Sequence, residues 1–309
     1  MTAPVAVFAY SRLAELQRTM AMLQQCHGIS DAPVYLFIDG PKGEADAPRV
    51  EAVQQFSRQL RWSNLQVHAA ESNRGLRRSI LAGVTQVVGE HGQVIVVEDD
   101  LLLAPIALQY FRAGLDRFSE EERVKAVCGY MYRMAPGDGD RAFFLPIASS
   151  WGWATWKRAW LPFVAREAAL VERADDPAFL RKFDRQGILA ASTMLKGQRA
   201  GLIDSWAILW NAYFAETDGL ALFPAETMVL NGGFASAGAT HSSRFNPING
   251  VLRDLNRDRT FASGFSLPTE VQVDDSARRA VASSSEARLH RLSARLGYVR
   301  RRLARLRQR

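Results

Sequence analysis

Short apolar runs alternate with stretches of helical periodicity along the first 123 residues. Runs 5–9, 34–38 and 94–97 are wholly apolar, as is typical of strands buried on both faces of a sheet, and 65–69 is predicted as a further strand. Apolar positions recur every three or four residues in 13–25, 49–60 and 76–88, which predicts three helices. Strands that alternate with helices form βαβ units, so we expect an α/β fold with a mainly parallel sheet.

The alternation weakens after residue 124. Segments 124–130 and 142–147 are predicted as strands of a more mixed sheet, and 177–199 and 205–216 as helices. Residues 246–285 are patchy and polar, and little regular structure is expected there.

The C-terminal segment 288–309 shows the clearest amphipathic pattern. Its apolar residues, spaced by three and four, are Leu289, Leu292, Leu296, Val299, Leu303 and Leu306. Arginines cover much of the remaining surface, which predicts a basic amphipathic helix. Such a helix binds an anionic membrane surface. A coiled-coil seam that makes an oligomer and a solvated tail remain as alternatives.

Charge is concentrated in this segment. The 309-residue chain has 39 basic and 32 acidic residues, and nine of the basic residues lie in 288–309, which leaves 30 against 32. The body is therefore close to neutral, and its charge argues against nucleic-acid binding. The two cysteines, Cys26 and Cys128, lie far apart in sequence and fit a reducing cytosol. The N-terminus reads as a strand, with no basic region before its apolar stretch.

Three adjacent carboxylates, Glu98-Asp99-Asp100, follow the fourth strand and precede another apolar run. Neighbouring acids repel one another and resist burial, so a cation should compensate them. A divalent metal ion that holds a phosphate is one candidate, and a solvated turn is the alternative. The other predicted strands also end in polar residues, at 10–12, 39–40 and 73–74. Because parallel strands direct their carboxyl ends to one edge, these segments should converge on a ligand site.

The chain resembles GT-A-fold nucleotide-sugar glycosyltransferases, closest to the branch of N-acetylglucosaminyltransferase I and its bacterial relatives. The matching pieces, in the family's order, are Phe8-Ala9-Tyr10-Ser11-Arg12, Phe37-Ile38-Asp39-Gly40, Asn73-Arg74-Gly75-Leu76-Arg77-Arg78, Val97-Glu98-Asp99-Asp100, Ser150-Trp151-Gly152-Trp153, Ile203-Asp204-Ser205-Trp206, and Asn231-Gly232-Gly233-Phe234 through Thr240-His241. They cover roughly residues 4–245, and their combination is more specific than any single piece.

The resemblance implies that the acidic triplet is a variant of the family's Asp-X-Asp motif. Asp100 would then bind Mn²⁺ or Mg²⁺, while Glu98 and Asp99 hold the donor sugar and ribose. Arg12 would contact the donor diphosphate, because its planar charged group suits phosphate oxygens. Asp39 resembles the acid that accepts a hydrogen bond from the uracil imide, with a plain Asp-Gly turn as the alternative.

Further roles follow from the later motifs. Arg77 is favoured over Arg78 as the arginine that approaches the donor. Asp204 is the expected catalytic base of an inverting transfer, although it also lies where a helix N-cap is predicted. His241, at the end of a Gly-rich loop suited to a mobile lid, resembles a late histidine that joins the metal or the diphosphate. The candidates for stacking on acceptor sugars are Trp151, Trp153 and Trp206, and ordinary core packing is expected for at least half of them.

Together these features predict a metal-dependent glycosyltransferase domain at 1–245, with a nucleotide-sugar half at 1–123 and an acceptor half at 124–245. An irregular extension at 246–287 and the basic helix at 288–309 complete the chain. The expected donor is a nucleotide-sugar, with UDP favoured and UDP-GlcNAc as one candidate. The acceptor would be a growing glycan or a lipid-linked glycan at the cytoplasmic membrane.

Two alternatives keep a similar sheet. A sugar-phosphate nucleotidylyltransferase would require a Gly-rich basic loop after the first strand, and residues 8–13 contain no glycine. A carbohydrate-binding scaffold that has lost turnover would not need the intact acids at 98–100 and 204.

Overall fold

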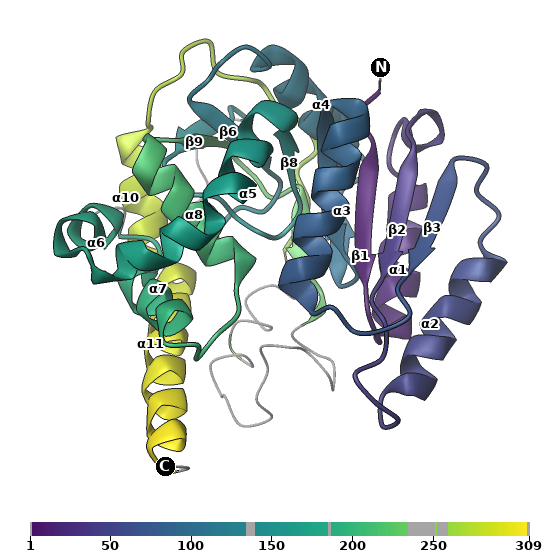
Figure 1. The fold of residues 1–309 in the computed structure, drawn as a ribbon. Helices are drawn as coiled ribbons and strands as arrows, with labels where there is room; N and C mark the ends of the chain where they lie inside the picture. The colour runs from purple at the N-terminus through teal and green to yellow at the C-terminus, as the bar shows by residue number, and fades with distance from the viewer. Residues whose placement is uncertain (1, 134–139, 185–186, 234–250, 252–258, 308–309) are drawn as a thin grey trace.

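The computed structural model describes residues 2–133, 140–184, 187–233, 251 and 259–307 (Figure 1). An eight-stranded sheet crosses the molecule in the order β3-β2-β1-β4-β8-β6-β9-β7. Its strands are β1 (Val5–Ala9), β2 (Val34–Ile38), β3 (Leu65–Ala69), β4 (Gln93–Glu98), β6 (Val124–Cys128), β7 (Phe143–Leu145), β8 (Trp153–Trp156) and β9 (Leu220–Phe223). β1 to β4 are mutually parallel, and β8 is antiparallel to both β4 and β6. The predicted mixed, mainly parallel α/β fold is confirmed.

Helices cover both faces of this sheet (Figure 1). Their bounds are α1 (Leu13–Gln24), α2 (Ala47–Gln59), α3 (Leu76–His91), α4 (Ala107–Arg117), α5 (Lys157–Glu172), α6 (Pro177–Asp184), α7 (Ala191–Arg199), α8 (Trp206–Thr217), α10 (Asp275–Ser283) and α11 (Ser285–Leu306). Two hydrophobic cores result. One joins α3, α5 and α8 to the sheet, and the other joins α1, α2 and α4 to its opposite face.

Strand β1 shows why the first apolar run has no polar positions. Ala6 and Phe8 belong to one core, whereas Val5, Val7 and Ala9 belong to the other. Since successive side chains of a strand point to opposite faces, a strand with a core on each side must be apolar throughout.

A second, two-stranded sheet lies next to the end of β4. β5 (Leu101–Leu103) pairs antiparallel with β10 (Val229–Asn231), with Leu101 opposite Asn231. This pairing brings the start of the Gly-rich segment to the residues that follow the acidic triplet, although the two are about 130 positions apart along the chain.

Some predicted boundaries differ from the structure. The segment predicted as one helix over 177–199 contains two helices, α6 and α7. The extension 246–287, expected to be irregular, includes helix α10 and bridges to the sheet region at Ser266 and Val273. Because β8 lies between β4 and β6, the two predicted halves share one continuous sheet.

The predicted amphipathic helix is α11, which begins three residues earlier than expected, at Ser285. It runs along the lower left of Figure 1 and carries the C-terminus past the body, on the side where the parallel strands end. Among the described residues, no helix has the length and hydrophobicity needed to cross a bilayer.

Candidate active site

Arg12 and the acidic triplet meet at the carboxyl ends of adjacent parallel strands. β4 ends at Glu98, whose register partner on β1 is Phe8, and Arg12 follows β1 by three residues. The Arg12 guanidinium donates from Nη1 to Asp100 Oδ2 at 2.8 Å and from Nη2 to Asp99 Oδ1. Asp99 is 3% and Asp100 9% exposed. The convergence that the strand pattern predicts for these two segments is therefore present.

The acids outnumber the cation that compensates them. Burial raises the pKa of Glu98 to about 8, the charges of Asp100 and Asp99 add to this rise, and Arg12 opposes it. Burial likewise raises the pKa of Asp99 to about 7, against the opposing effect of Arg12. Full ionisation of three acids beside one guanidinium is therefore unfavourable in this poorly solvated place, and a bound cation would favour it.

The oxygen donors at this edge fit a hard divalent cation in charge and ligand type. No group of three or more His, Cys, Asp or Glu side chains within the described part of the chain is arranged to hold a metal ion. The ligand set would therefore need oxygens from a bound diphosphate or from water. His241, the second predicted ligand, lies outside the described residues.

The Gly-rich segment begins directly against Asp100. Gly232 donates its backbone N–H to the Asp100 carbonyl at 2.8 Å, and Gly233 donates to Asn231 Oδ1 at 2.8 Å. A Cβ at Gly233 would collide with the carboxylate of Asp100, so this position accepts only glycine. The start of the predicted lid thus lies beside the predicted metal ligand.

Asp39 organises the loop between β3 and α3. Its Oδ1 accepts hydrogen bonds from the backbone of Gly40 (3.0 Å) and Arg74 (2.8 Å), and its Oδ2 accepts from Asn73 Nδ2 (3.0 Å) and the backbone of Gly75 (2.9 Å). Four donors use the acceptor sites of one carboxylate. Recognition of a nucleobase by Asp39 stays a prediction, and it would require an exchange of at least one of these partners.

A cavity of about 310 Å³ lies between β2, β3 and α3, next to Asp39. The ring of Phe37 stacks on His68 at 5.0 Å, and both line this cavity together with Gln86. Nε2 of His68 is buried and has no hydrogen-bond partner among the described residues. His68 and Gln86 were not predictable as site residues, because a histidine in a half-exposed strand and a glutamine in a helix carry no recognisable motif.

Arg77 links Asp204 to an acid that the sequence analysis did not identify. Nε of Arg77 donates to Glu167 Oε1 at 2.7 Å, and Nη1 donates to Asp204 Oδ1 at 3.1 Å. The side chain of Asp204 is 65% exposed. The N-cap of α8 is Ser205, whose Oγ accepts from the backbone of Ile208. Asp204 is therefore not the helix cap, and Arg77 is the arginine that pairs with it.

Two of the three tryptophans considered for the acceptor side belong to the core, as the core-packing alternative predicts for at least half of them. Trp153 is 1% and Trp206 3% exposed, and their rings stack on each other at 5.1 Å. Buried rings cannot offer a face to a sugar. Trp151 is half-buried and makes edge contacts with Tyr130 at 4.6 Å and His290 at 5.5 Å, so its acceptor role stays a prediction.

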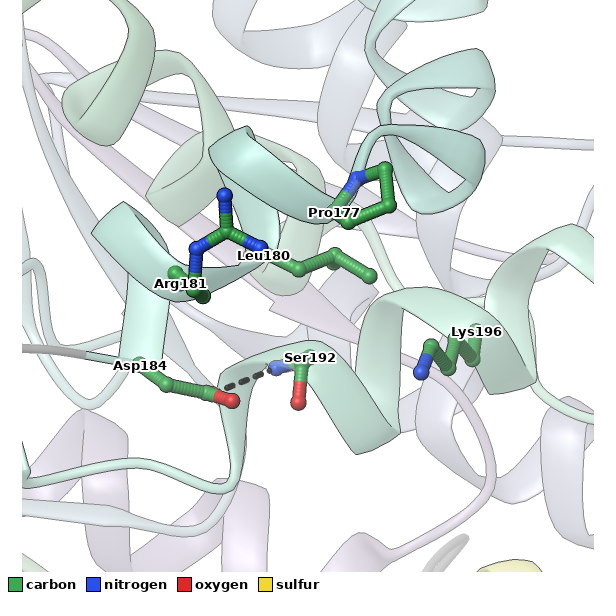
Figure 2. A pocket seen from close by; sticks show the side chains of 6 residues that line it. All are labelled: Pro177, Leu180, Arg181, Asp184, Ser192 and Lys196. Carbon is green, nitrogen blue, oxygen red and sulfur yellow. Dashed lines mark hydrogen bonds between the residues drawn. The ribbon is translucent and has the colours of Figure 1, made fainter.

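A larger cavity, about 580 Å³, lies between α6 and α7 and contains none of the predicted site residues (Figure 2). Arg181 and Lys196 line it, and Asp184 accepts the backbone N–H of Ser192 across it at 2.9 Å. Asp184, the one carboxylate among these lining residues, is already engaged by the Ser192 backbone, so volume alone does not make this cavity the reaction centre.

No protein-family model matches the chain, and a search of curated proteins gave no match. Three solved structures illustrate what it is similar to. The mannosyltransferase PcManGT from Pyrobaculum calidifontis, in complex with GDP-Man and Mn²⁺, is 12% identical with a TM-score of 0.41, over 99% of this chain and 88% of that chain. GalNAc-T7 with UDP, GalNAc and Mn²⁺ is 12% identical with a TM-score of 0.42, over 82% of this chain. S. aureus TarS is 17% identical with a TM-score of 0.31, over 45% of this chain.

The chain spans 47% of the length of the GalNAc-T7 chain and 24% of the TarS chain. Similarity at these TM-scores assigns neither a fold family nor an activity. The functional proposal therefore depends on the residues of this chain.

Proposed function

We propose that the protein is a metal-dependent, inverting glycosyltransferase with a GT-A fold that uses a nucleotide-sugar donor. The observation that carries the proposal is the surplus of carboxylates at 98–100, which face a single guanidinium at the carboxyl ends of the parallel strands. A surplus of this kind is costly unless a cation relieves it. A divalent ion would supply the missing positive charge, and a diphosphate would complete its oxygen ligands at the sheet edge where α/β folds bind ligands.

The roles proposed for the donor side follow from this geometry. Asp100, together with His241, would hold Mn²⁺ or Mg²⁺, and Glu98 and Asp99 would hold the sugar and ribose. When bound, the ion would neutralise the departing diphosphate. Arg12 is already paired with two of the acids. With an ion bound to these carboxylates, the Arg12 guanidinium would be available to the diphosphate oxygens.

Asp204 is proposed as the catalytic base, which takes the proton of the acceptor hydroxyl as that oxygen attacks the anomeric carbon and the nucleoside diphosphate leaves. Its Oδ1 is held by Arg77, and its side chain is mostly exposed, as a residue that meets an incoming acceptor requires. Arg77 would then act near the base and close to the donor.

The favoured donor is UDP-linked, with UDP-GlcNAc as one candidate. The proposed binding place of its uracil ring is Asp39 with the adjacent cavity. The proposed acceptor is a growing cell-surface polysaccharide or glycolipid precursor, met at the inner face of the cytoplasmic membrane. The arginine-rich helix α11 supports this location, because cationic amphipathic helices bind anionic bilayers.

Calorimetric titration of UDP with and without Mn²⁺ tests the donor site. We expect binding that depends on the metal and is lost in Asp100→Asn. Binding of equal strength with and without Mn²⁺ would contradict the proposal. A panel of nucleotide-sugars, assayed for hydrolysis with Mn²⁺ present, would then identify the sugar.

The assignment of Asp204 as the catalytic base is tested separately. Asp204→Asn should abolish transfer while the affinity for the UDP-sugar stays near that of the wild type, because the residue is not proposed to contact the donor. Unchanged turnover in this variant would remove the assignment.

A further inference from the structure

Helix α11 exposes a continuous apolar stripe. Leu292, Leu296, Val299, Leu303 and Leu306 are 47%, 54%, 52%, 53% and 61% exposed, respectively. They follow one another at intervals of four and three residues, so they share one side of the helix. An apolar side chain that is half exposed costs free energy in water, and five on one line form a surface that favours a covering partner.

The opposite side of α11 is fixed to the body. The carboxylate of Glu286 is 1% exposed and accepts hydrogen bonds from Tyr130 Oη and from the backbone of Arg133. Nη1 of Arg291 donates to the carbonyls of Gly187 (2.6 Å) and Ala282 (2.9 Å). At a turn of roughly 100° per residue, both anchors lie about 100° or more from the centre of the stripe.

A third anchor is close to the C-terminus of the helix. Nη1 of Arg305 donates to the carbonyl of Ala200 at the end of α7, on the same side as Arg291. α11 is therefore a rigid part of the protein over most of its length, and not a flexible tether.

Positive charge borders the stripe on both edges. Arg288, Arg295 and Arg302 lie along one edge, and Arg300 and Arg307 lie along the other. The only acid in α11 is Glu286, which is buried against the body. An apolar strip between two rows of arginines fits a bilayer, because the long side chains bury their stems and reach anionic headgroups with their charged ends.

We propose that α11 docks this protein on an anionic phospholipid bilayer through this stripe, and that the three anchors make the docking orient the whole body. A second copy of the chain fits the same surface poorly, since its arginines would meet arginines at both edges in either helix direction. Figure 1 shows α11 extending beyond the body on the side where the parallel strands end. This orientation would bring the acids at 98–100 near a lipid-linked acceptor, and that role rests on the proposed function. The docking of α11 on a bilayer does not depend on it.

Flotation with vesicles tests the proposal on the full chain. Wild-type protein should bind vesicles of phosphatidylglycerol and phosphatidylcholine, weakly at high salt, and should not bind phosphatidylcholine alone. The double variant Leu296→Ser/Leu303→Ser should bind at least about tenfold more weakly, because two apolar anchors are lost. Arg295→Gln/Arg302→Gln should weaken binding about tenfold through the lost charge. The matched control is Val67→Ser, an exposed apolar residue of β3 (41% exposed), which should bind as the wild type does.

Two outcomes would overturn the proposal. One is equal vesicle binding by the wild type and the leucine variant. The other is absence of vesicle binding together with a concentration-dependent dimer, seen by analytical ultracentrifugation, that the leucine variant abolishes. Binding of UDP with Mn²⁺, measured on the same proteins, separates this test from that of the proposed function. Vesicle binding without metal-dependent UDP binding would leave the docking intact and contradict only the transferase.

Discussion

Two of the regions that bury carboxylates treat the charge in opposite ways. At the ends of β1 and β4, three acids lie together, Arg12 pairs with two of them, Asp99 and Asp100, and burial raises the pKa of Glu98 to about 8. At the N-terminus of α11, a single acid, Glu286, accepts hydrogen bonds from the Tyr130 hydroxyl and the Arg133 backbone N–H. Burial also raises the pKa of Glu286, to about 7, but its hydrogen bonds are satisfied, and Arg259 Nη1 lies 3.8 Å from Oε2.

The contrast separates a site from a structural anchor. An acid with enough donors stabilises the contact between two elements, here α11 and the 130–133 segment. Adjacent buried acids that repel one another destabilise the fold, and a ligand that supplies positive charge relieves that cost.

The largest expected effect concerns activity. Asp100→Asn should reduce turnover on the order of 10³-fold, because an amide keeps the shape but removes the charge that holds the ion. The matched control is Glu286→Gln, which alters a buried acid outside the site and should leave turnover within a few-fold of the wild type. Initial rates at saturating donor measure both. Equal losses in the two variants would remove the distinction between the regions.

Stability should change with opposite signs in the two regions. Glu286→Ala leaves the Tyr130 hydroxyl and the Arg133 N–H without their acceptor, and should lower the free energy of unfolding by about 3 kcal/mol. Glu98→Gln removes an acid whose ionisation the fold disfavours, and it should raise the free energy of unfolding by about 1 kcal/mol. Chemical denaturation at pH 7 without divalent ions measures both. Destabilisation by Glu98→Gln would show that the acidic edge is already compensated.

Arg77 makes ion pairs with Glu167 and Asp204, and a smaller effect is expected when the first of these is removed. Glu167→Gln should lower kcat about tenfold with the donor KM unchanged, since Glu167 positions the guanidinium that holds Asp204. The effect should be lost in an Arg77→Ala background, because Glu167 acts only through Arg77. Glu172→Gln is the matched control on α5, where the acid pairs with Arg199 at the surface. Equal additive losses in both backgrounds would contradict a positioning role.

The smallest expected effect is a pH dependence of stability, in which two opposite trends largely cancel in the wild type. Burial raises the pKa of Glu286 to about 7, so its contribution to stability falls as pH rises from its ordinary value toward 7. Burial lowers the pKa of His290 to about 4, so its contribution rises as pH increases from 4 to its ordinary value of 6.5. The two groups are 3.9 Å apart and face Tyr130 and Arg259, and their opposite trends largely cancel between pH 4.5 and 6.5.

Single variants should reveal the two trends. In Glu286→Gln, the melting temperature should rise with pH over this range, and in His290→Gln it should fall. The underlying change in the free energy of unfolding is up to about 1 kcal/mol per pH unit in each variant. Thermal unfolding followed by circular dichroism between pH 4.5 and 7 measures this. Parallel trends in the two variants would contradict the pKa shifts.

The parallel half of the sheet was predictable because its physical constraint is local. Strands with a core on each face must be apolar throughout, and the loops that follow them carry polar residues, so the alternation and the convergence of Arg12 with Asp99 and Asp100 followed from the pattern. The stripe on α11 was predictable for the same reason, since residues three and four apart share one side of any helix.

The roles of several single residues were not predictable. Trp153 and Trp206 lie in motifs that resemble a ligand site, and a tryptophan has the same pattern whether its ring is covered or open. Glu167 lies 90 residues from the arginine that it holds, and a lone acid on a helix resembles a solvated one.

The sequence by itself determined the order of strands and helices over residues 5–98, the polar ends of the parallel strands and the two-sided character of the last helix, because each is set by the periodicity of neighbouring residues. Only the tertiary structure decided that Asp39 is held by four donors, that Trp153 and Trp206 are buried, and that Glu286 anchors α11. Those outcomes depend on groups brought together from distant parts of the chain, and burial and hydrogen-bond supply are properties of the assembled neighbourhood.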